Sequence, residues 1–227
     1  MCVDAQTVSV ASDFLNRRVG ELAASIPGAT RVFRRHRINF CCAGERELIQ
    51  AIEKRGLDAQ VIVDELVALE NVDDALPVAA DTPTLITFIL NRYHDTHRAE
   101  LQELVLLARK VERVHANDEN CPIGLSAILE ELLIDLNDHM IKEETVLFPV
   151  MLNADAMVMG PIAQMRFEHE NHGEYIHRLE AVTSHLSLPG GACNSWRALY
   201  DGVAKLIEDL VAHIYIENRV LFPRFER

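Results

Sequence analysis

Apolar residues recur at steps of three and four along most of the chain, which is the spacing of one face of an α-helix. After Pro83 four long stripes of this kind follow one another with short connections. This pattern predicts an all-α protein whose C-terminal part is an antiparallel four-helix bundle. The first stripe consists of Leu90, His94, His97, Leu101, Leu104, Ala108 and Val111; the others run from Leu125 to Val146, Ile162 to Leu179 and Trp196 to Val220.

The chain before the bundle shows shorter helical segments. Prolines at 77 and 83, with no clear period around them, indicate a linker over residues 71–83. We therefore expect a small helical domain over residues 1–70 and a bundle over residues 84–227. Helices in the small domain are predicted over residues 10–24, 27–35, 45–54 and 58–69, with a loop at Cys41-Cys42-Ala43-Gly44.

Composition narrows the function classes. The 227 residues are 49% hydrophobic and 25% charged, with a formal net charge of -13. This acidic balance argues against a general nucleic-acid binder. No apolar run approaches the roughly 20 residues of a membrane helix, and the first residues lack signal-peptide character, so a cytoplasmic location without membrane association is expected. Five cysteines, an odd number, favour reduced thiols over a disulfide framework.

Two of the predicted bundle helices contain the same motif. His139-x3-Glu143 leads into Leu147-Phe148-Pro149, and His213-x3-Glu217 leads into Leu221-Phe222-Pro223. The other two helices also match each other, because His94-x2-His97 has the spacing of His169-x2-His172. A helical hairpin that occurs twice indicates a bundle with a pseudo-twofold axis.

The repeated motif predicts a metal site. Residues four apart share a helix face, and here that face is the apolar one. A carboxylate in a bundle core is costly unless it is paired or binds a metal. Four imidazoles and two carboxylates suit iron, zinc or manganese, and two bridging carboxylates favour a dinuclear site. The alternatives are an exposed ion pair for a single His-x3-Glu and a hydrogen-bonded core residue for a lone histidine; the repetition favours the metal.

The pattern of histidines and glutamates resembles the hemerythrin-like di-iron bundle. Further segments resemble one subfamily, the repair-of-iron-centres (YtfE/ScdA-type) proteins, over nearly the whole chain. These segments are Arg92-Tyr93-His94-Asp95, 110–115, 139–144, Met159-Gly160-Pro161-Ile162 and Leu221-Phe222-Pro223-Arg224, with Ile26-Pro27, Phe33 and Cys41-Cys42-x-Gly44 in the N-terminal part.

The resemblance implies a ligand set for two non-haem irons joined by oxo or hydroxo and carboxylate bridges. The ligands would be His94, His139, Glu143, His169, His213 and Glu217, with the glutamates bridging. Gly173 stands where oxygen-carrying hemerythrins have a fifth histidine, which would leave the cluster more open. Residues expected to support the ligands are His97, His172, Glu144 and Tyr93. His97 or His172 could instead substitute for a ligand if the helical register differs by one turn. Glu144 could instead line an access path or be solvated, and Tyr93 could pack in the core.

His115 belongs to a segment that matches the family, but its position excludes it from the same cluster. It lies 21 residues after His94, ~31 Å along a continuous helix at ~1.5 Å per residue. We therefore expect His115 to have a role at the helix end.

The resemblance also implies a function, the repair of iron–sulfur clusters damaged by nitrosative or oxidative stress through supply of labile iron. The alternatives are reduction of nitric oxide to nitrous oxide at the same irons, and gas or redox sensing. Expected partners are damaged iron–sulfur proteins or their assembly machinery, with nitric oxide or oxygen as small ligands. Cys41 and Cys42 are either part of a tight turn or free thiols that accept iron or react with nitric oxide.

Overall fold

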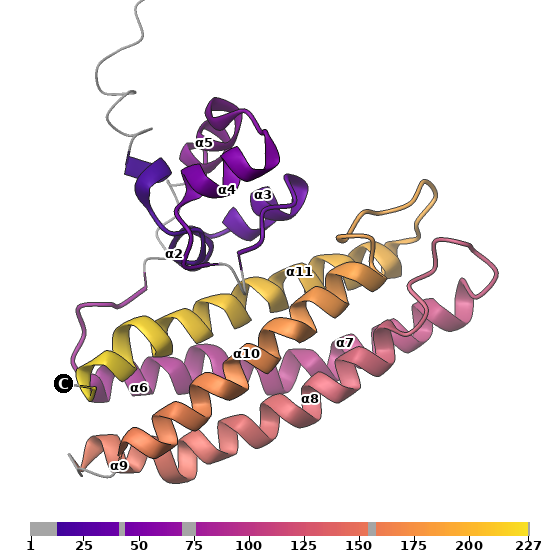
Figure 1. Ribbon diagram of the computed structural model, residues 1–227. Coiled ribbons are helices and arrows are strands. Elements are labelled where there is room, and N and C mark those ends of the chain that lie inside the picture. The colour runs from indigo at the N-terminus through magenta and orange to yellow at the C-terminus, as the bar shows by residue number, and fades with distance from the viewer. Residues whose placement is uncertain (1–12, 41–43, 70–75, 154–157, 227) are drawn as a thin grey trace, which may run out of the picture. The chain divides into compact units, whose positions relative to one another are not determined.

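The computed structural model describes residues 13–40, 44–69, 76–153 and 158–226. The chain forms two compact units, residues 1–76 and 77–227 (Figure 1). The described residues form helices and one isolated bridge between Arg18 and Glu47, with no strand among them. The prediction of an all-α protein is confirmed.

The N-terminal unit contains four labelled short helices around an apolar core. Asp58 caps the last of them by accepting a hydrogen bond from the Gln60 N–H at 2.9 Å. Gly28 precedes the second helix with a φ of 86°, a conformation that favours glycine. The helices are α2 (Val19–Ser25), α3 (Ala29–Arg35), α4 (Leu48–Arg55) and α5 (Ala59–Val67), and Phe14, Leu22, Phe33, Leu48, Ile62 and Leu66 are core residues.

The prediction of one continuous helix over residues 10–24 is wrong at residues 17–18. Residues 13–16 are helical, the chain leaves the helix at 17–18, and α2 begins at Val19. The backbone at 17–20 instead pairs with residues 44–48, since the Gly20 N–H donates to the Gly44 carbonyl at 2.9 Å. A Cβ on Gly20 would lie 3.1 Å from the Gly44 Cα, so this approach depends on glycine.

The second unit is the four-helix bundle that the apolar stripes predict. In Figure 1 its four long rods lie side by side and consecutive rods run in opposite directions. The first rod consists of α6 (Thr82–Ile89), the π-helical turn η1 (Leu90–His94) and α7 (Asp95–Val114). The second consists of α8 (Leu125–Lys142), the π-helical turn η2 (Glu143–Leu147) and α9 (Phe148–Leu152). The third is α10 (Met159–Val182), and the fourth consists of α11 (Asn194–Tyr215), the π-helical turn η4 (Ile216–Leu221) and the 3₁₀ turn η5 (Phe222–Arg224).

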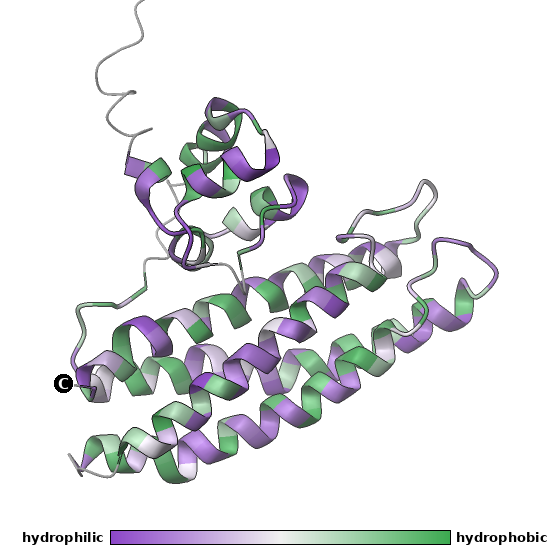
Figure 2. Cartoon of the chain, viewed as in Figure 1, coloured by the Kyte–Doolittle hydropathy of each residue, from purple (hydrophilic) through white to green (hydrophobic). Residues whose placement is uncertain are grey.

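The predicted stripes fill the bundle core, except that the second stripe is wrong at its last residue: Val146 is 49% exposed and Leu147 is buried in its place, because the wide turn η2 changes the helical spacing there. Apolar and polar positions alternate around each rod in Figure 2, as expected for amphipathic helices packed together. Asp81 begins the first rod by accepting a hydrogen bond from the Thr84 N–H at 2.9 Å. None of the described helices combines the length and the apolar character that a bilayer crossing requires. Core residues from the four rods include Leu101, Ala108, Leu129, Leu136, Ile162, Ile176, Leu199 and Leu206.

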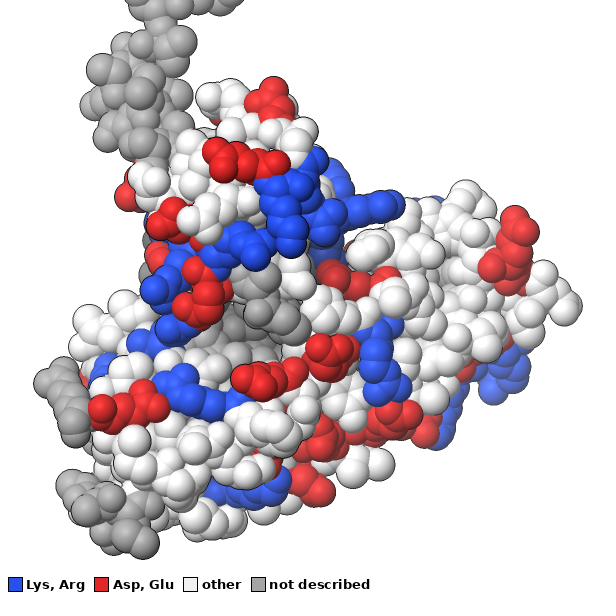
Figure 3. Space-filling view, in the orientation of Figure 1, with Lys and Arg blue, Asp and Glu red and all other residues white. Residues whose placement is uncertain are grey.

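The bundle surface carries both acidic and basic side chains. On the face shown in Figure 3, acidic and basic residues lie interleaved along the rods. Several form ion pairs; Lys205 on α11, for example, binds Glu100 of α7 at 2.7 Å and Asp209 of its own helix at 2.8 Å. Exposed pairs of this kind contribute little stability each, so the bundle depends chiefly on its apolar core.

Candidate metal centre

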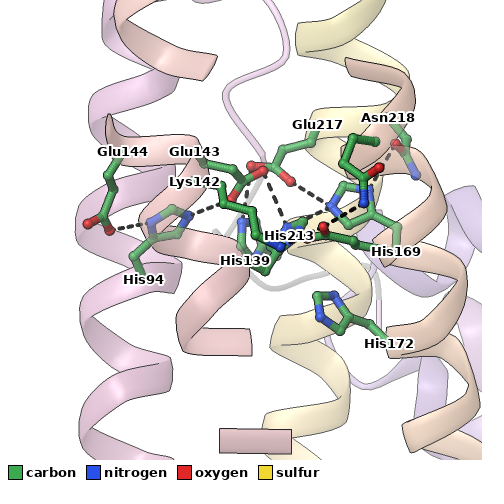
Figure 4. A network of polar contacts seen from close by, with 12 residues as sticks. His94, His139, Lys142, Glu143, Glu144, His169, His172, His213, Glu217 and Asn218 are labelled. Carbon is green, nitrogen blue, oxygen red and sulfur yellow. Dashed lines mark hydrogen bonds and ion pairs between the residues drawn. The ribbon is translucent and has the colours of Figure 1, made fainter. Parts of the chain in front are cut away.

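Six polar side chains from all four rods meet inside the bundle (Figure 4). All six are buried, three of them on η1, η2 and η4 and three on α8, α10 and α11. They are the six residues singled out from the sequence: His94, His139, Glu143, His169, His213 and Glu217.

The six side chains form two overlapping sets of four. In each set the potential ligand atoms lie within 4.8 Å of one another. One set contains His94 and His213, the other contains His139 and His169, and Glu143 and Glu217 belong to both. Two metal positions that share both carboxylates are therefore available.

Each glutamate faces two imidazole nitrogens, one from its own rod and one from another. Glu143 lies 3.3 Å from the His94 Nε2 and 3.4 Å from the His139 Nε2. Glu217 lies 3.1 Å from the His169 Nε2 and 3.2 Å from the His213 Nε2. The Nε2 atoms of His139 and His169 are themselves only 3.2 Å apart. This convergence of electron-pair donors fits a site for a positive ion.

Unpaired buried atoms support the same conclusion. Both carboxylate oxygens of Glu143, one of Glu217 and the Nε2 of His94 have no hydrogen-bond partner among the described residues. Polar atoms left unpaired in a protein core cost free energy, and native structures contain few of them. A metal ion would satisfy these atoms together, and imidazole nitrogen with carboxylate oxygen is a suitable donor set for iron, zinc or manganese. The residues present therefore fit a metal.

The buried charges shift the pKa values of the cluster. Burial opposes protonation of His139, but the adjacent Glu143 carboxylate outweighs it and raises the pKa of His139 to about 9. Burial also disfavours the charged form of Glu217, yet the imidazoles of His213 and His169 hold its pKa well below the usual value. Glu143 likewise raises the pKa of His94 against the effect of burial, so without a metal the carboxylates are compensated by protons on His94 and His139, which a metal would displace.

Wide helical turns position several of the six residues. η1 ends at His94, η2 begins at Glu143, and η4 contains Glu217. In η2 the Phe148 N–H donates to the Glu143 carbonyl, five residues back instead of four. Such π-helical turns often occur at functional sites.

The Leu-Phe-Pro repeat explains two of these turns. Pro149 and Pro223 follow directly after the phenylalanines whose N–H groups close η2 and η4. In a regular helix each proline ring would clash with the carbonyl four residues back, and a widened turn relieves that clash. No proline follows η1, so this explanation does not apply to the turn at His94.

The outward-facing ring nitrogens of three histidines are held by hydrogen bonds. The Nδ1 of His94 lies 2.7 Å from Glu144, that of His139 lies 2.8 Å from Glu168, and that of His169 lies 3.0 Å from Asn218. Such contacts fix the ring orientation and direct Nε2 toward a metal.

Sequence reasoning missed two of these three partners, Glu168 and Asn218. A signal for them was present, because each partner is the chain neighbour of a candidate ligand on another rod. Glu144 follows Glu143, Glu168 precedes His169, and Asn218 follows Glu217.

The other expected supporting residues contact the cluster through their rings. Tyr93 stacks on His213 with ring centroids 5.1 Å apart. His97 lies 5.5 Å from the His213 ring, and His172 lies 4.7 Å from the His139 ring. Neither ring nitrogen of His97 or His172 has a hydrogen-bond partner within the described parts of the chain. Burial lowers the pKa of both, for His172 to about 2, so both are neutral.

His115 lies at the C-terminal end of α7, as the helix length predicts. Its Nε2 is 3.2 Å from the Sγ of Cys193, the residue that precedes α11, and its ring packs on Trp196. His115 is thus remote from the six clustered residues. Cys41 and Cys42 lie outside the described residues.

The helical bundle and its buried set of four imidazoles and two carboxylates are those of the non-haem metal-binding bundle proteins. Residues 85–225 match the family described as "Hemerythrin HHE cation binding domain", and residues 15–70 match ScdA_N, "Domain of Unknown function (DUF542)". Relatives from Yersinia pseudotuberculosis serotype O:1b (strain IP 31758) and Yersinia pestis (strain Pestoides F), both named "Iron-sulfur cluster repair protein YtfE", are 43% identical over 215 residues. The alignments cover 93% of this chain and 97% of each relative. The chain belongs to the hemerythrin HHE family, in the group of YtfE proteins that the sequence motifs predicted.

Proposed function

We propose that this protein holds two non-haem irons in the bundle and supplies iron for the repair of damaged iron–sulfur clusters. The observation that carries the proposal is the pair of donor sets that share Glu143 and Glu217. The name of the relatives, iron–sulfur cluster repair protein, supports the same function for this chain.

In this proposal each iron has two imidazoles of its own and both glutamates in common. His94 and His213 would hold one iron, and His139 and His169 would hold the other. Glu143 and Glu217 would serve both irons, together with oxo or hydroxo groups. When bound, the metal pair would supply exchangeable iron. Because Gly173 stands where oxygen-carrying hemerythrins have a fifth histidine, four histidines would serve two irons and the centre would be more open.

The protein's own residues keep the centre assembled and dry. Core side chains cover the six ligands, which are all buried. Phe148 stacks on the His94 ring with centroids 5.9 Å apart, and Phe222 stacks on His169 at 6.0 Å. These phenylalanines belong to the Leu-Phe-Pro repeat, so one short motif both shapes the turn at each glutamate and packs against a ligand of another rod.

For the N-terminal part the proposal rests on sequence. We assign residues 1–70 to a helical domain whose Cys41 and Cys42 accept or pass on iron, residues 71–83 to a linker and residues 84–227 to the iron-binding bundle. Thiolates are suitable ligands for the iron of iron–sulfur clusters. Cys41 and Cys42 follow a segment of basic and imidazole side chains, which favours the thiolate form: Arg34, Arg35, His36 and Arg37. Damaged iron–sulfur proteins in the cytoplasm would be the recipients.

The test is metal analysis followed by transfer. Protein prepared without oxygen should carry about two irons per chain with the Mössbauer spectrum of a coupled pair. Mixed with a cluster-depleted enzyme, cysteine and sulfide, it should restore that enzyme's activity, whereas a Glu143→Leu/Glu217→Leu variant should not. Well under about two irons after reconstitution would refute the dinuclear site. Full loading without transfer, but with nitrous oxide formed from nitric oxide, would favour the reductase function instead.

A further inference from the structure

We propose that the two metal positions differ in stability and that the iron between His94 and His213 is the one released. This inference rests on the proposed function, because it requires two bound irons. Both glutamates serve both positions, so a difference between the positions must come from the histidines.

At the position between His139 and His169, both ligand histidines are restrained by hydrogen bonds. Both histidines have a hydrogen-bond partner on Nδ1, Glu168 for the first and Asn218 for the second. Glu168 is itself fixed by Lys142 at 2.7 Å and Gln164 at 2.8 Å, through the oxygen that His139 does not use.

Asn218 is restrained as well. The Arg166 guanidinium donates a hydrogen bond to its backbone carbonyl at 3.2 Å and also forms an ion pair with Glu226 at 2.8 Å. Neither histidine of this position can turn away without breaking a supported hydrogen bond.

The position between His94 and His213 is held less firmly. The Nδ1 of His213 is buried and has no hydrogen-bond partner among the described residues. Its ring contacts the rings of Tyr93, His94 and His97, with centroids 5.1, 5.0 and 5.5 Å away, but ring contacts do not select which nitrogen carries the proton.

The support for His94 is also weaker than that for His139. The Glu144 oxygen that contacts His94 accepts a second hydrogen bond from Arg98 at 2.8 Å. The Glu144 side chain is 29% exposed, against 13% for Glu168. A carboxylate that is shared and closer to water increases the basicity of its histidine less.

The physical consequence is a difference in metal affinity. A hydrogen bond to the outer nitrogen fixes the tautomer and orientation of a ligand histidine, and its loss costs ~10–100-fold in metal affinity. One such bond is missing at the His94/His213 position. We therefore expect iron there to leave at least ~10-fold faster. Release is ligand exchange without a change of oxidation state: the chelator replaces the protein ligands, which take up protons from water.

The experiment is chelator-induced release from the anaerobic di-iron(II) protein, with ferrozine in excess. Wild type should release iron in two phases of equal amplitude that differ ~10-fold or more in rate. Asn218→Ala should accelerate the slow phase and leave the fast phase unchanged. Asn171→Ala is the matched control, because Asn171 is an exposed residue of α10 next to His172. Circular dichroism of each variant would exclude unfolding as the cause of faster release.

A second readout locates the released iron directly. Crystals of the loaded protein, soaked briefly in chelator, should lose the iron anomalous signal at the His94/His213 position first. Loss at the His139/His169 position first, equal loss at both, or acceleration of the fast phase by Asn218→Ala would overturn the inference. Protein that binds well under about two irons before chelator is added would refute the proposed function itself.

Discussion

The carboxylates of Glu143 and Glu217, 74 residues apart in the chain, have ligand atoms within 4.8 Å of each other in the bundle core. Each side chain is fully buried, and the charge of each disfavours ionisation of the other. The arrangement is stable only with compensating positive charge, from protonated histidines or from metal ions. The relationship explains why the His-x3-Glu motif occurs twice and why both copies face inward.

Replacing either glutamate should empty the metal site. Glu143→Leu or Glu217→Leu should reduce bound iron from about two per chain to less than about one, because each carboxylate serves both positions. His115→Leu should leave iron content unchanged, since His115 lies at the far end of α7. Inductively coupled plasma analysis of the three variants makes the comparison, and equal loss from all three would contradict the assignment.

The metal-free protein should lose stability in alkaline solution. His139 has a folded-state pKa of about 9, above the ordinary value of 6.5. Its protonation therefore stabilises the folded state fully below pH ~6.5, and this contribution disappears as the pH rises through about 9. Thermal unfolding of metal-free protein should show a falling Tm across this range. His139→Gln should flatten the profile, and an identical profile in that variant would show that another group is responsible.

Replacing a proline of the repeated motif should weaken metal binding but raise the stability of the metal-free protein. Pro149→Ala restores an N–H and removes the ring that favours the wide turn at Glu143. We expect the helix to tighten, moving Glu143 and weakening metal binding ~10-fold, as for loss of a supporting contact. The metal-free variant should unfold at a higher temperature, because alanine permits a regular α-helical turn with the restored N–H hydrogen-bonded, which proline does not.

The control for this prediction is Pro161→Ala, near the start of α10, where proline belongs to a first helical turn. It should leave metal affinity unchanged. Unaltered metal affinity in Pro149→Ala, measured by competition with a chromogenic chelator, would show that the turn at Glu143 does not depend on the proline.

Two cysteines at the same end of the bundle should differ in reactivity. The Trp196 backbone N–H and the His115 ring lower the pKa of Cys193, whereas burial and the nearby Glu112 and Asp118 raise the pKa of Cys121. At pH 7.5 iodoacetamide should therefore modify Cys193 ~10-fold faster, because the thiolate is the nucleophile. Peptide mass spectrometry resolves the sites, and His115→Leu should narrow the difference. Equal modification rates of Cys193 and Cys121 in the wild-type protein would contradict this prediction.

Replacing Cys41 and Cys42 by serine tests the role of the N-terminal thiols. The double variant should keep its full iron content, since the six bundle residues form both metal positions without a thiol. Transfer of iron to a cluster-depleted enzyme should fall several-fold if the thiols pass iron on. Loss of bundle iron in this variant would instead show that the thiols are ligands.

The local part of the structure could be predicted from the sequence. Helix periodicity, the Asp81 cap and the two His-x3-Glu motifs depend on residues a few positions apart, so a single pass along the chain detects them. The interruption at 17–18 could not be predicted this way, because it depends on pairing with residues 44–48.

Sequence alone therefore determined the all-α class, the repeated hairpin and the inward stripe that carries the candidate ligands. Tertiary structure decided which outer nitrogens are supported: Asn218 holds His169 from another rod, whereas the outer nitrogen of the buried His213 has no partner in the described chain. The physical reason is distance along the chain. Helical spacing sets which side of a rod a residue faces, but the height and rotation of neighbouring rods, set by core packing, determine which side chains meet.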